Sequence, residues 1–161
     1  MRVGLDIGST TIKCVVLNDA GQIVYSTYER HFSHTLEKGR ALLEKVAADY
    51  LPDGRAYFAI SGSAGMGLAD SCKVPFVQEV FATRVAANRL APGTDCIIEL
   101  GGEDAKILFL TNGTEVRMNG SCAGGTGAFI APMATLLKMG ADEMDKAAQA
   151  ATRPYHTPSP R

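Results

Sequence analysis

The 161-residue sequence predicts an α/β fold of two units that share one order of strands and helices. Three observations support this prediction. Three strand patterns, a helix, a strand and a second helix follow one another before the Pro92-Gly93 turn, and three strand patterns and a helix follow it. The first hairpin of each set carries an acidic residue and glycine at its turn. We therefore expect a first unit over residues 1–93, an incomplete second unit over residues 94–151 and a frayed tail over residues 152–161.

The first unit opens with three antiparallel strands. Apolar residues alternate with polar ones on both sides of a Gly-Ser-Thr-Thr turn, which is the pattern of a β-hairpin. Leu36, Leu42 and Val46 recur at helical spacing, so a helix should cover one face of this sheet. We expect strands over residues 2–7, 12–17, 22–30 and 57–61, a Gly-rich loop over residues 62–67, and helices over residues 35–50 and 77–90.

The second unit begins with the same order. Met133, Leu136 and Leu137 lie at helical spacing, with Met139 nearby, and we expect them in the core. The expected strands cover residues 95–100, 105–110 and 115–118, and the expected helices cover residues 125–139 and, with a more polar pattern, residues 142–151.

The composition is typical of a soluble, globular protein, and the lack of a membrane span or signal-peptide region predicts that it is cytoplasmic. Hydrophobic residues make up 46% and charged residues 20%, and the formal net charge of -1 gives no positive field for a nucleic acid. No apolar run reaches the roughly 18 to 20 residues of a membrane span, and the N-terminus lacks the apolar region of a signal peptide. We therefore expect neither a nucleic acid nor a membrane as a partner.

The four cysteines are far apart and form no Cys-x-x-Cys pair, so neither a zinc site nor a disulfide framework is indicated. Cys14, Cys72 and Cys96 are expected to be core or loop thiols. The three histidines receive no functional role, because their spacing supplies no further metal ligands. Cys122 is different, because it lies among four glycines just ahead of an apolar helical pattern.

A Gly-rich turn follows the first predicted strand. Its glycine lets the backbone approach a phosphate, and the turn amides and hydroxyls can donate to phosphate oxygens. Asp6, at the end of the strand, can hold Mg²⁺ through water. An ordinary tight hairpin turn is the alternative. The candidate phosphate-binding residues of this first loop are Gly8, Ser9, Thr10, Thr11 and Lys13.

Residues 99–104 repeat the acid-x-Gly pattern, with Gly101 and Gly102 at the turn. This second loop suits a clamp on a terminal phosphate and its metal, in which Glu103 or Asp104 orients the attacking water. A Gly-Gly turn with solvated acids is the alternative. We expect the Gly-rich segment after residue 61 to line the same cleft or an interface.

Two such units facing each other across a nucleotide cleft are the organisation of the actin, Hsp70 and sugar-kinase superfamily. We therefore expect its ribonuclease H-like ATPase fold, with the first unit complete and the second truncated.

The sequence also resembles a narrower family, the ATP-dependent activators of 2-hydroxyacyl-CoA dehydratases and the related ATPase subunits of benzoyl-CoA reductases. The matching stretches are residues 4–13, 99–106 and 119–129, in the family's order. The third is the most specific, because sugar kinases and chaperones of the same fold have no cysteine ahead of their Gly-Thr-Gly loop. Residues 75–80 look closest to the large, multidomain members.

The resemblance implies an ATPase that drives a low-potential electron into a dehydratase or reductase component that uses radical chemistry. It implies a homodimer that shares one 4Fe-4S cluster, held by two cysteines of each subunit, and a donor such as ferredoxin or flavodoxin. Cys122 occupies the position of the first cluster ligand, where the helix dipole stabilises a thiolate. The implied nucleotide-binding residues beside it are Gly124, Gly125, Thr126 and Gly127.

The family's second cluster cysteine and its late adenosine-binding loop have no counterpart after Cys122. We therefore expect an N-terminal fragment that is inactive alone, binds ATP weakly and cannot complete a four-cysteine site.

Two other functions fit the same fold. A sugar or small-molecule kinase would keep both phosphate loops and use Asp104 as a general base. A non-catalytic, actin-like module would bury Cys122 as a small residue. Cys122 favours the activator, because a kinase has no use for a thiol at that place.

Overall fold

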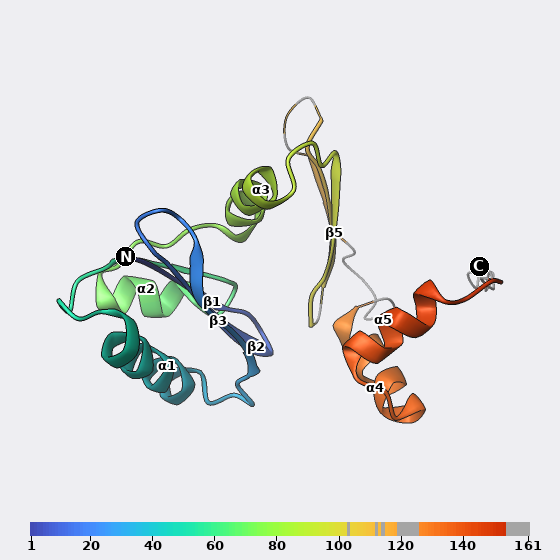
Figure 1. The fold of residues 1–161 in the computed structure, drawn as a ribbon, viewed down its shortest axis with the longest axis horizontal. Coiled ribbons are helices and arrows are strands. Elements are labelled where there is room, and N and C mark those ends of the chain that lie inside the picture. Colours follow the sequence, from blue (N-terminus) through green and yellow to red (C-terminus); the bar gives the residue numbers. More distant parts are fainter. Residues whose placement is uncertain (103, 112, 114, 119–125, 154–161) are drawn as a thin grey trace.

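The computed structural model describes residues 1–102, 104–111, 113, 115–118 and 126–153. Two sheets follow one another along the chain, and helices accompany each of them (Figure 1). The strands are β1 (Arg2–Ile7), β2 (Thr11–Leu17), β3 (Ile23–Arg30), β4 (Tyr57–Ser61), β5 (Cys96–Leu100), β6 (Ala105–Phe109) and β7 (Glu115–Met118). The helices are α1 (Thr35–Tyr50), α2 (Met66–Cys72), α3 (Glu79–Leu90), α4 (Gly127–Leu137) and α5 (Ala141–Gln149).

The first sheet has the order β3-β2-β1-β4. Its first three strands form antiparallel hairpins, and β4 returns through α1 to pair parallel with β1, as a crossover helix allows. The second sheet has the order β5-β6-β7 and is antiparallel throughout. The three strands that open each predicted unit are therefore confirmed.

Alternation along β1 and β2 gives the first sheet one buried face. Val3, Leu5 and Ile7 point to the same side as Ile12 and Cys14, and all are buried. Leu42 and Val46 of α1 and Ala69 of α2 join this cluster, so both helices cover that face. The opposite face carries Gly4, Asp6 and Lys13, and it lies on the side of α3.

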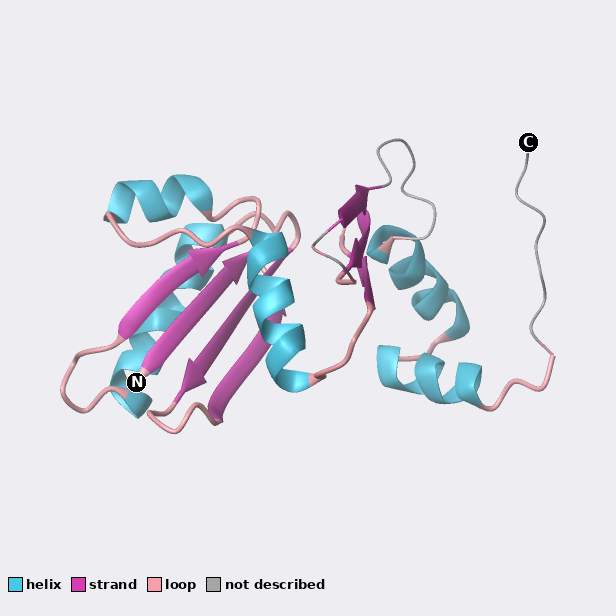
Figure 2. Ribbon diagram, turned by 90° about the horizontal axis from the view of Figure 1, so that it is seen from above, coloured by secondary structure: helices cyan, strands magenta, loops and turns pink. Residues whose placement is uncertain are grey.

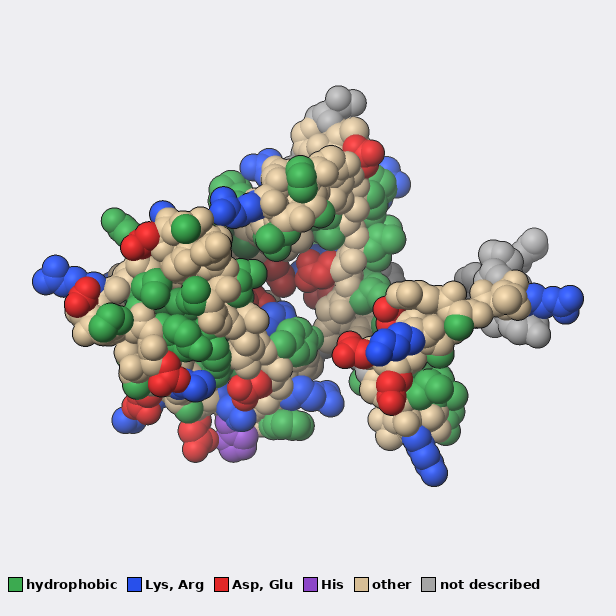
Figure 3. Space-filling view, viewed as in Figure 1, with side chains coloured by type: hydrophobic (Ala, Val, Ile, Leu, Met, Phe, Trp, Pro, Cys, Tyr) green, Lys and Arg blue, Asp and Glu red, His purple; other side chains and the backbone are tan. Residues whose placement is uncertain are grey.

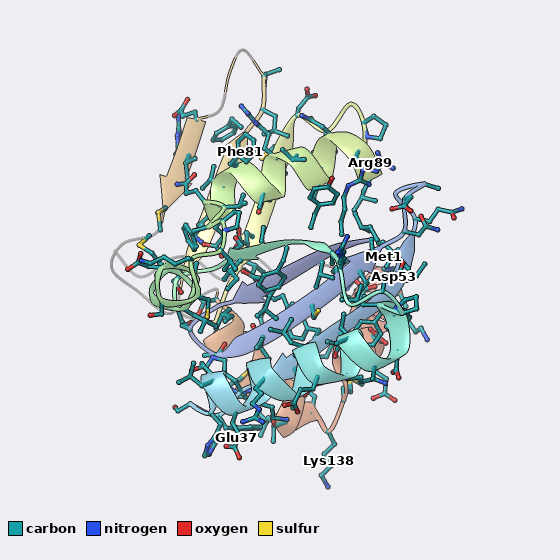
Figure 4. The ribbon with its side chains drawn as sticks, turned by 90° about the vertical axis from the view of Figure 1, so that its left-hand side faces the viewer. Met1, Glu37, Asp53, Phe81, Arg89 and Lys138 are labelled. Atoms are coloured by element: carbon teal, nitrogen blue, oxygen red, sulfur yellow. The ribbon has the colours of Figure 1, made fainter. Side chains whose placement is uncertain are left out.

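Figure 4 shows this sandwich from the side, with Glu37 on α1 and both Phe81 and Arg89 on α3 at opposite sides of the first sheet. Figures 1 and 2 agree that α3 lies between the two sheets. Within the residues described, no helix is both long and apolar enough to cross a membrane.

The segment between β4 and α3 corrects two expectations. The loop expected over residues 62–67 ends in a helix, because α2 begins at Met66, and Cys72 therefore closes a helix rather than lying in a loop. The next helix begins at Glu79 instead of residue 77. Phe76 pairs with Ile60 of β4, and the backbone amide of Val77 donates to the Ile60 carbonyl at 2.8 Å. The chain is therefore still extended beside β4 at residue 77, and the helix begins after it. A seven-residue helix is too short to show a clear period.

The apolar face of α4 corrects a third expectation from the sequence. Leu136 is 73% and Leu137 56% exposed, and Met139 is exposed too, whereas helical spacing placed them in the core. Periodicity identifies a face that a partner element would bury, and in the described chain no element buries this one.

Candidate functional site

The first Gly-rich loop joins β1 to β2 and ends in an ion pair. Asp6 and Lys13 face each other in the antiparallel register, and Lys13 Nζ lies 2.6 Å from Asp6 Oδ2. The amide of Gly8 donates to the Thr11 carbonyl at 2.9 Å, which closes the turn. Lys13 also lies 5.3 Å from the ring centre of Tyr28, its neighbour on β3. The loop therefore carries a cation at the base of a turn rich in amides and hydroxyls.

The second loop, between β5 and β6, has the same construction. Glu99 and Lys106 are register partners, with Nζ 3.5 Å from Oε1, and the amide of Gly101 donates to the Asp104 carbonyl at 2.8 Å. Sequence reasoning recognised the repeated acid and glycine but gave Lys106 no role. The signal was present, since acid and lysine have the same spacing in residues 6–13 and 99–106.

The structure brings the two loops together around one cavity of about 550 Å³, within the size range of ligand pockets. A side chain at Gly102 would collide with Thr10 Oγ1, so the loops are in near contact. Figure 3 shows a hollow between the two parts of the molecule, with acidic and basic side chains inside it. Of the residues singled out in the sequence, those that line the cavity are Gly8, Ser9, Thr10, Thr11, Lys13, Gly101, Gly102 and Asp104.

Two further segments complete the cavity wall. Gly62 and Ser63 line it, so the Gly-rich segment after β4 faces this cleft. Gln78 and Glu79, at the start of α3, line it as well. Glu79 Oε2 lies 2.6 Å from Lys106 Nζ, which joins α3 to the second hairpin. Nothing in the sequence pattern distinguished Glu79 from an ordinary acid in the first turn of a helix.

His31 stabilises the first loop through contacts with its backbone carbonyls. It is 4% exposed, its Nε2 lies 3.1 Å from the Gly8 carbonyl, and its own amide donates to the Thr10 carbonyl. The amide of Ser33 donates to Nδ1 at 3.1 Å, so Nδ1 is the acceptor and Nε2 carries the hydrogen. The sequence pattern around His31 predicts no role for it, and only its hydrogen-bond partners reveal one.

The start of α4 touches the second loop. Thr126 is fully buried at the N-cap, and the amide of Gly127 donates to the Gly101 carbonyl at 2.7 Å. The predicted site residues Glu103, Cys122, Gly124 and Gly125 lie outside the residues that the structure describes. The described contact with the second loop therefore involves Gly127, which follows Cys122 by five positions in the sequence.

The remaining cysteines do not form a ligand set. Burial raises the pKa of Cys14 to about 11, so this thiol stays protonated near neutral pH and is a poor metal ligand. Cys72 is exposed on α2 and Cys96 is exposed on β5, which corrects the expectation that Cys96 is a core or loop thiol. Among the described residues no three His, Cys, Asp or Glu side chains gather as a metal site. This part of the chain does not by itself fit an iron-sulfur cluster.

A magnesium ion fits better. Mg²⁺ keeps several waters and uses one or two carboxylates together with substrate phosphates, so it needs no cage of three acids. Asp104 lines the cavity from the second loop, whereas Asp6 is partly exposed beside Lys13 and is not among the lining residues. Either carboxylate could hold a hydrated ion through its waters.

Comparison with known proteins gives consistent matches along the chain. The sequence model of the BadF/BadG/BcrA/BcrD ATPase family matches residues 3–160. The chain is 27% identical over 139 residues to the (R)-2-hydroxyglutaryl-CoA dehydratase activating ATPase of Acidaminococcus fermentans, an alignment that covers 85% of this chain and 54% of that protein. It is 33% identical over 150 residues to the 2-hydroxyisocaproyl-CoA dehydratase activator of Clostridioides difficile, covering 88% and 54%.

A solved structure shows the same fold. The activator of the 2-hydroxyisocaproyl-CoA dehydratase from Clostridium difficile, with bound ADPNP, matches with a TM-score of 0.79 and 28% identity, covering 98% of this chain and 60% of that one. This likeness confirms the predicted fold class. The chain spans just over half the length of the two curated relatives.

Proposed function

The chain belongs to the BadF/BadG/BcrA/BcrD ATPase family. We propose that it binds MgATP between its two Gly-rich loops and acts as part of an ATP-dependent activator of a 2-hydroxyacyl-CoA dehydratase. One observation carries this proposal. Two hairpins of the same construction, each with an acid-lysine pair below a closed turn, face one cavity. Such a pair of loops can hold a chain of phosphates from two sides.

The roles of the residues follow from their positions. The amides and hydroxyls of Ser9 and Thr10 would donate to phosphate oxygens, Gly8 would let the backbone approach them, and Lys13 would neutralise their charge. Asp6 would hold the hydrated Mg²⁺, which offsets the charge that develops on the phosphates. Asp104 or Glu103 would orient the attacking water from the second loop. Lys13 suits its role because its side chain is 35% exposed and opens to the cavity.

The substitution Lys13→Met tests the nucleotide site. It removes the charge at the base of the first loop while keeping most of the stem, so MgADPNP should bind at least about tenfold more weakly, the loss of one charge-assisted contact. Isothermal titration calorimetry measures this change. The control is Lys73→Met, which removes an exposed lysine paired with Asp70 on α2 and should leave the affinity unchanged. Equal affinity of Lys13→Met and the wild type would contradict the assignment.

We also propose that the activator transfers an electron through an iron-sulfur cluster. By its resemblance to the family, Cys122 would supply one thiolate to a 4Fe-4S cluster shared by two copies, and ATP hydrolysis would drive an electron from it into the dehydratase. The contact between Gly127 and Gly101 supports a link between the nucleotide and the Cys122 segment. The described cysteines do not complete the ligand set, so further cysteines have to come from elsewhere.

Cys122→Ser tests this role. In a longer chain that also carries the further cysteines, purified without oxygen, we expect the substitution to abolish the iron-sulfur absorption and the electron paramagnetic resonance signal of the reduced cluster. Cys72→Ser changes an exposed thiol on α2 and should leave both signals intact. A cluster that survives in Cys122→Ser would refute the role of this thiol.

A further inference from the structure

Lys106 is the most enclosed cation of the cavity wall. Its side chain is 11% exposed, and its ammonium lies 2.6 Å from Glu79 Oε2 and 3.5 Å from Glu99 Oε1. Desolvation lowers the pKa of Lys106, but the hydrogen bond that its ammonium donates to Glu79 and the charges of Glu99 and Glu79 outweigh it, so the pKa is raised above its ordinary value. The lysine is therefore charged and committed to two carboxylates.

The corresponding lysine of the first hairpin is arranged differently. Lys13 has the same register relative to Asp6 but has one carboxylate partner and is 35% exposed. The two hairpins thus share a plan, while their lysines differ in partners and in access to the cavity. Lys13 is open to a ligand, whereas Lys106 is held by the protein.

The two partners of Lys106 come from different parts of the fold. Glu99 is on β5, in its own hairpin, and Glu79 is in the first turn of α3. No residue of α3 is buried, so this helix has little apolar contact to fix it. At its other end, Arg89 donates to the Gly21 carbonyl, in the turn between β2 and β3, at 3.3 Å. Polar contacts at both ends therefore position α3 between the sheets.

We propose that Lys106 is a positioning residue that couples the second phosphate loop to α3. Without its charge, Glu79 and Glu99 would face each other across the cavity wall as two like charges, and the start of α3 would separate from the hairpin. Nucleotide bound at Gly101 and Gly102 would then no longer affect α3. The effect of bound nucleotide on α3 rests on the function proposed above. The ion pairs of Lys106 that join the second loop to α3 are present without nucleotide.

Thermal unfolding tests the coupling in the empty protein. Lys106→Met, Glu79→Gln and the double variant form a cycle, and the double variant should lower the Tm by clearly less than the sum of the two single changes. Lys106→Arg keeps the charge and should recover most of the loss. Additive shifts would overturn the proposal. If Lys106→Met does not fold, Lys106→Gln, which also removes the charge but keeps a polar side chain, takes its place in the cycle.

Hydrogen exchange tests the transmission with MgADPNP as the probe. In the wild type, the nucleotide should protect both loops and the first turn of α3. In Lys106→Met it should still protect residues 8–11 but not residues 79–84, and Lys106→Arg should restore the second effect. Protection of α3 that persists in Lys106→Met would overturn the proposal. No protection anywhere in the wild type would refute the proposed function instead, and the unfolding cycle would still decide the role of Lys106.

Discussion

Gly62→Ala is expected to destabilise the protein and to distort the nucleotide cleft. Gly62 has φ of +90°, which strains any other residue, and an added Cβ would press on the Ile7 carbonyl and lie 2.6 Å from Asp6 Oδ1. The obstacle is mainly backbone, and the Ile7 carbonyl is already fixed because it accepts the amide of Ala64 at 2.9 Å. Relief therefore requires movement of the first loop or of the turn after β4. We expect a loss of about 2 to 4 kcal/mol in the free energy of unfolding.

Urea denaturation measures this loss, and Gly54→Ala is the matched control. Gly54 also has positive φ, +63°, but an added Cβ there meets nothing within 4 Å. The control isolates backbone strain, for which we expect about 1 kcal/mol. If both variants unfold at the same urea concentration, the close contact between Gly62 and the first loop is not important.

Asp6→Asn is expected to remove the magnesium dependence of nucleotide binding with little effect on stability. The amide keeps the shape of the carboxylate but cannot hold a hydrated cation as strongly, so the affinity for MgATP should fall by about 10- to 100-fold, as for partners that act on a metal through another ligand. The Asp6-Lys13 pair is partly exposed, so its loss should cost about 1 kcal/mol or less.

Titrations of ATP with and without MgCl₂ separate the two effects. The wild type should bind ATP more tightly with magnesium, and Asp6→Asn should show almost no difference between the two conditions. Asp70→Asn removes an exposed carboxylate paired with Lys73 and should behave as the wild type. A magnesium effect of wild-type size in Asp6→Asn would show that another group holds the ion.

The sequence predicts the strands and the longer helices of the described chain. The bounds of α1, β4 and β7 agree with the structure residue for residue, because proline, glycine or an alternating pattern marks their ends. It does not predict α2, which is only seven residues long. It also misplaces the apolar residues of α4, because a period cannot tell whether a partner covers the face it identifies.

The candidate site divides in the same way. Local chemistry is enough to pick out the two loops, because acid, glycine and hydroxyl residues occur together in each. His31 and Glu79 act through residues distant in sequence, the Gly8 carbonyl and the Lys106 ammonium, so only folding shows their roles. Lys106 is only partly predictable. Its spacing from Glu99 repeats that of Lys13 from Asp6, but its second partner, Glu79, is on α3.

We propose that the two loops form one phosphate site. Nuclear magnetic resonance of the ¹⁵N-labelled chain during a titration with MgATP shows whether both loops bind the same ligand. We predict that the amide signals of Gly8, Ser9 and Thr10 shift together with those of Gly101 and Gly102, and that all follow one common binding curve. Shifts confined to one loop, or two curves with different midpoints, would contradict the claim.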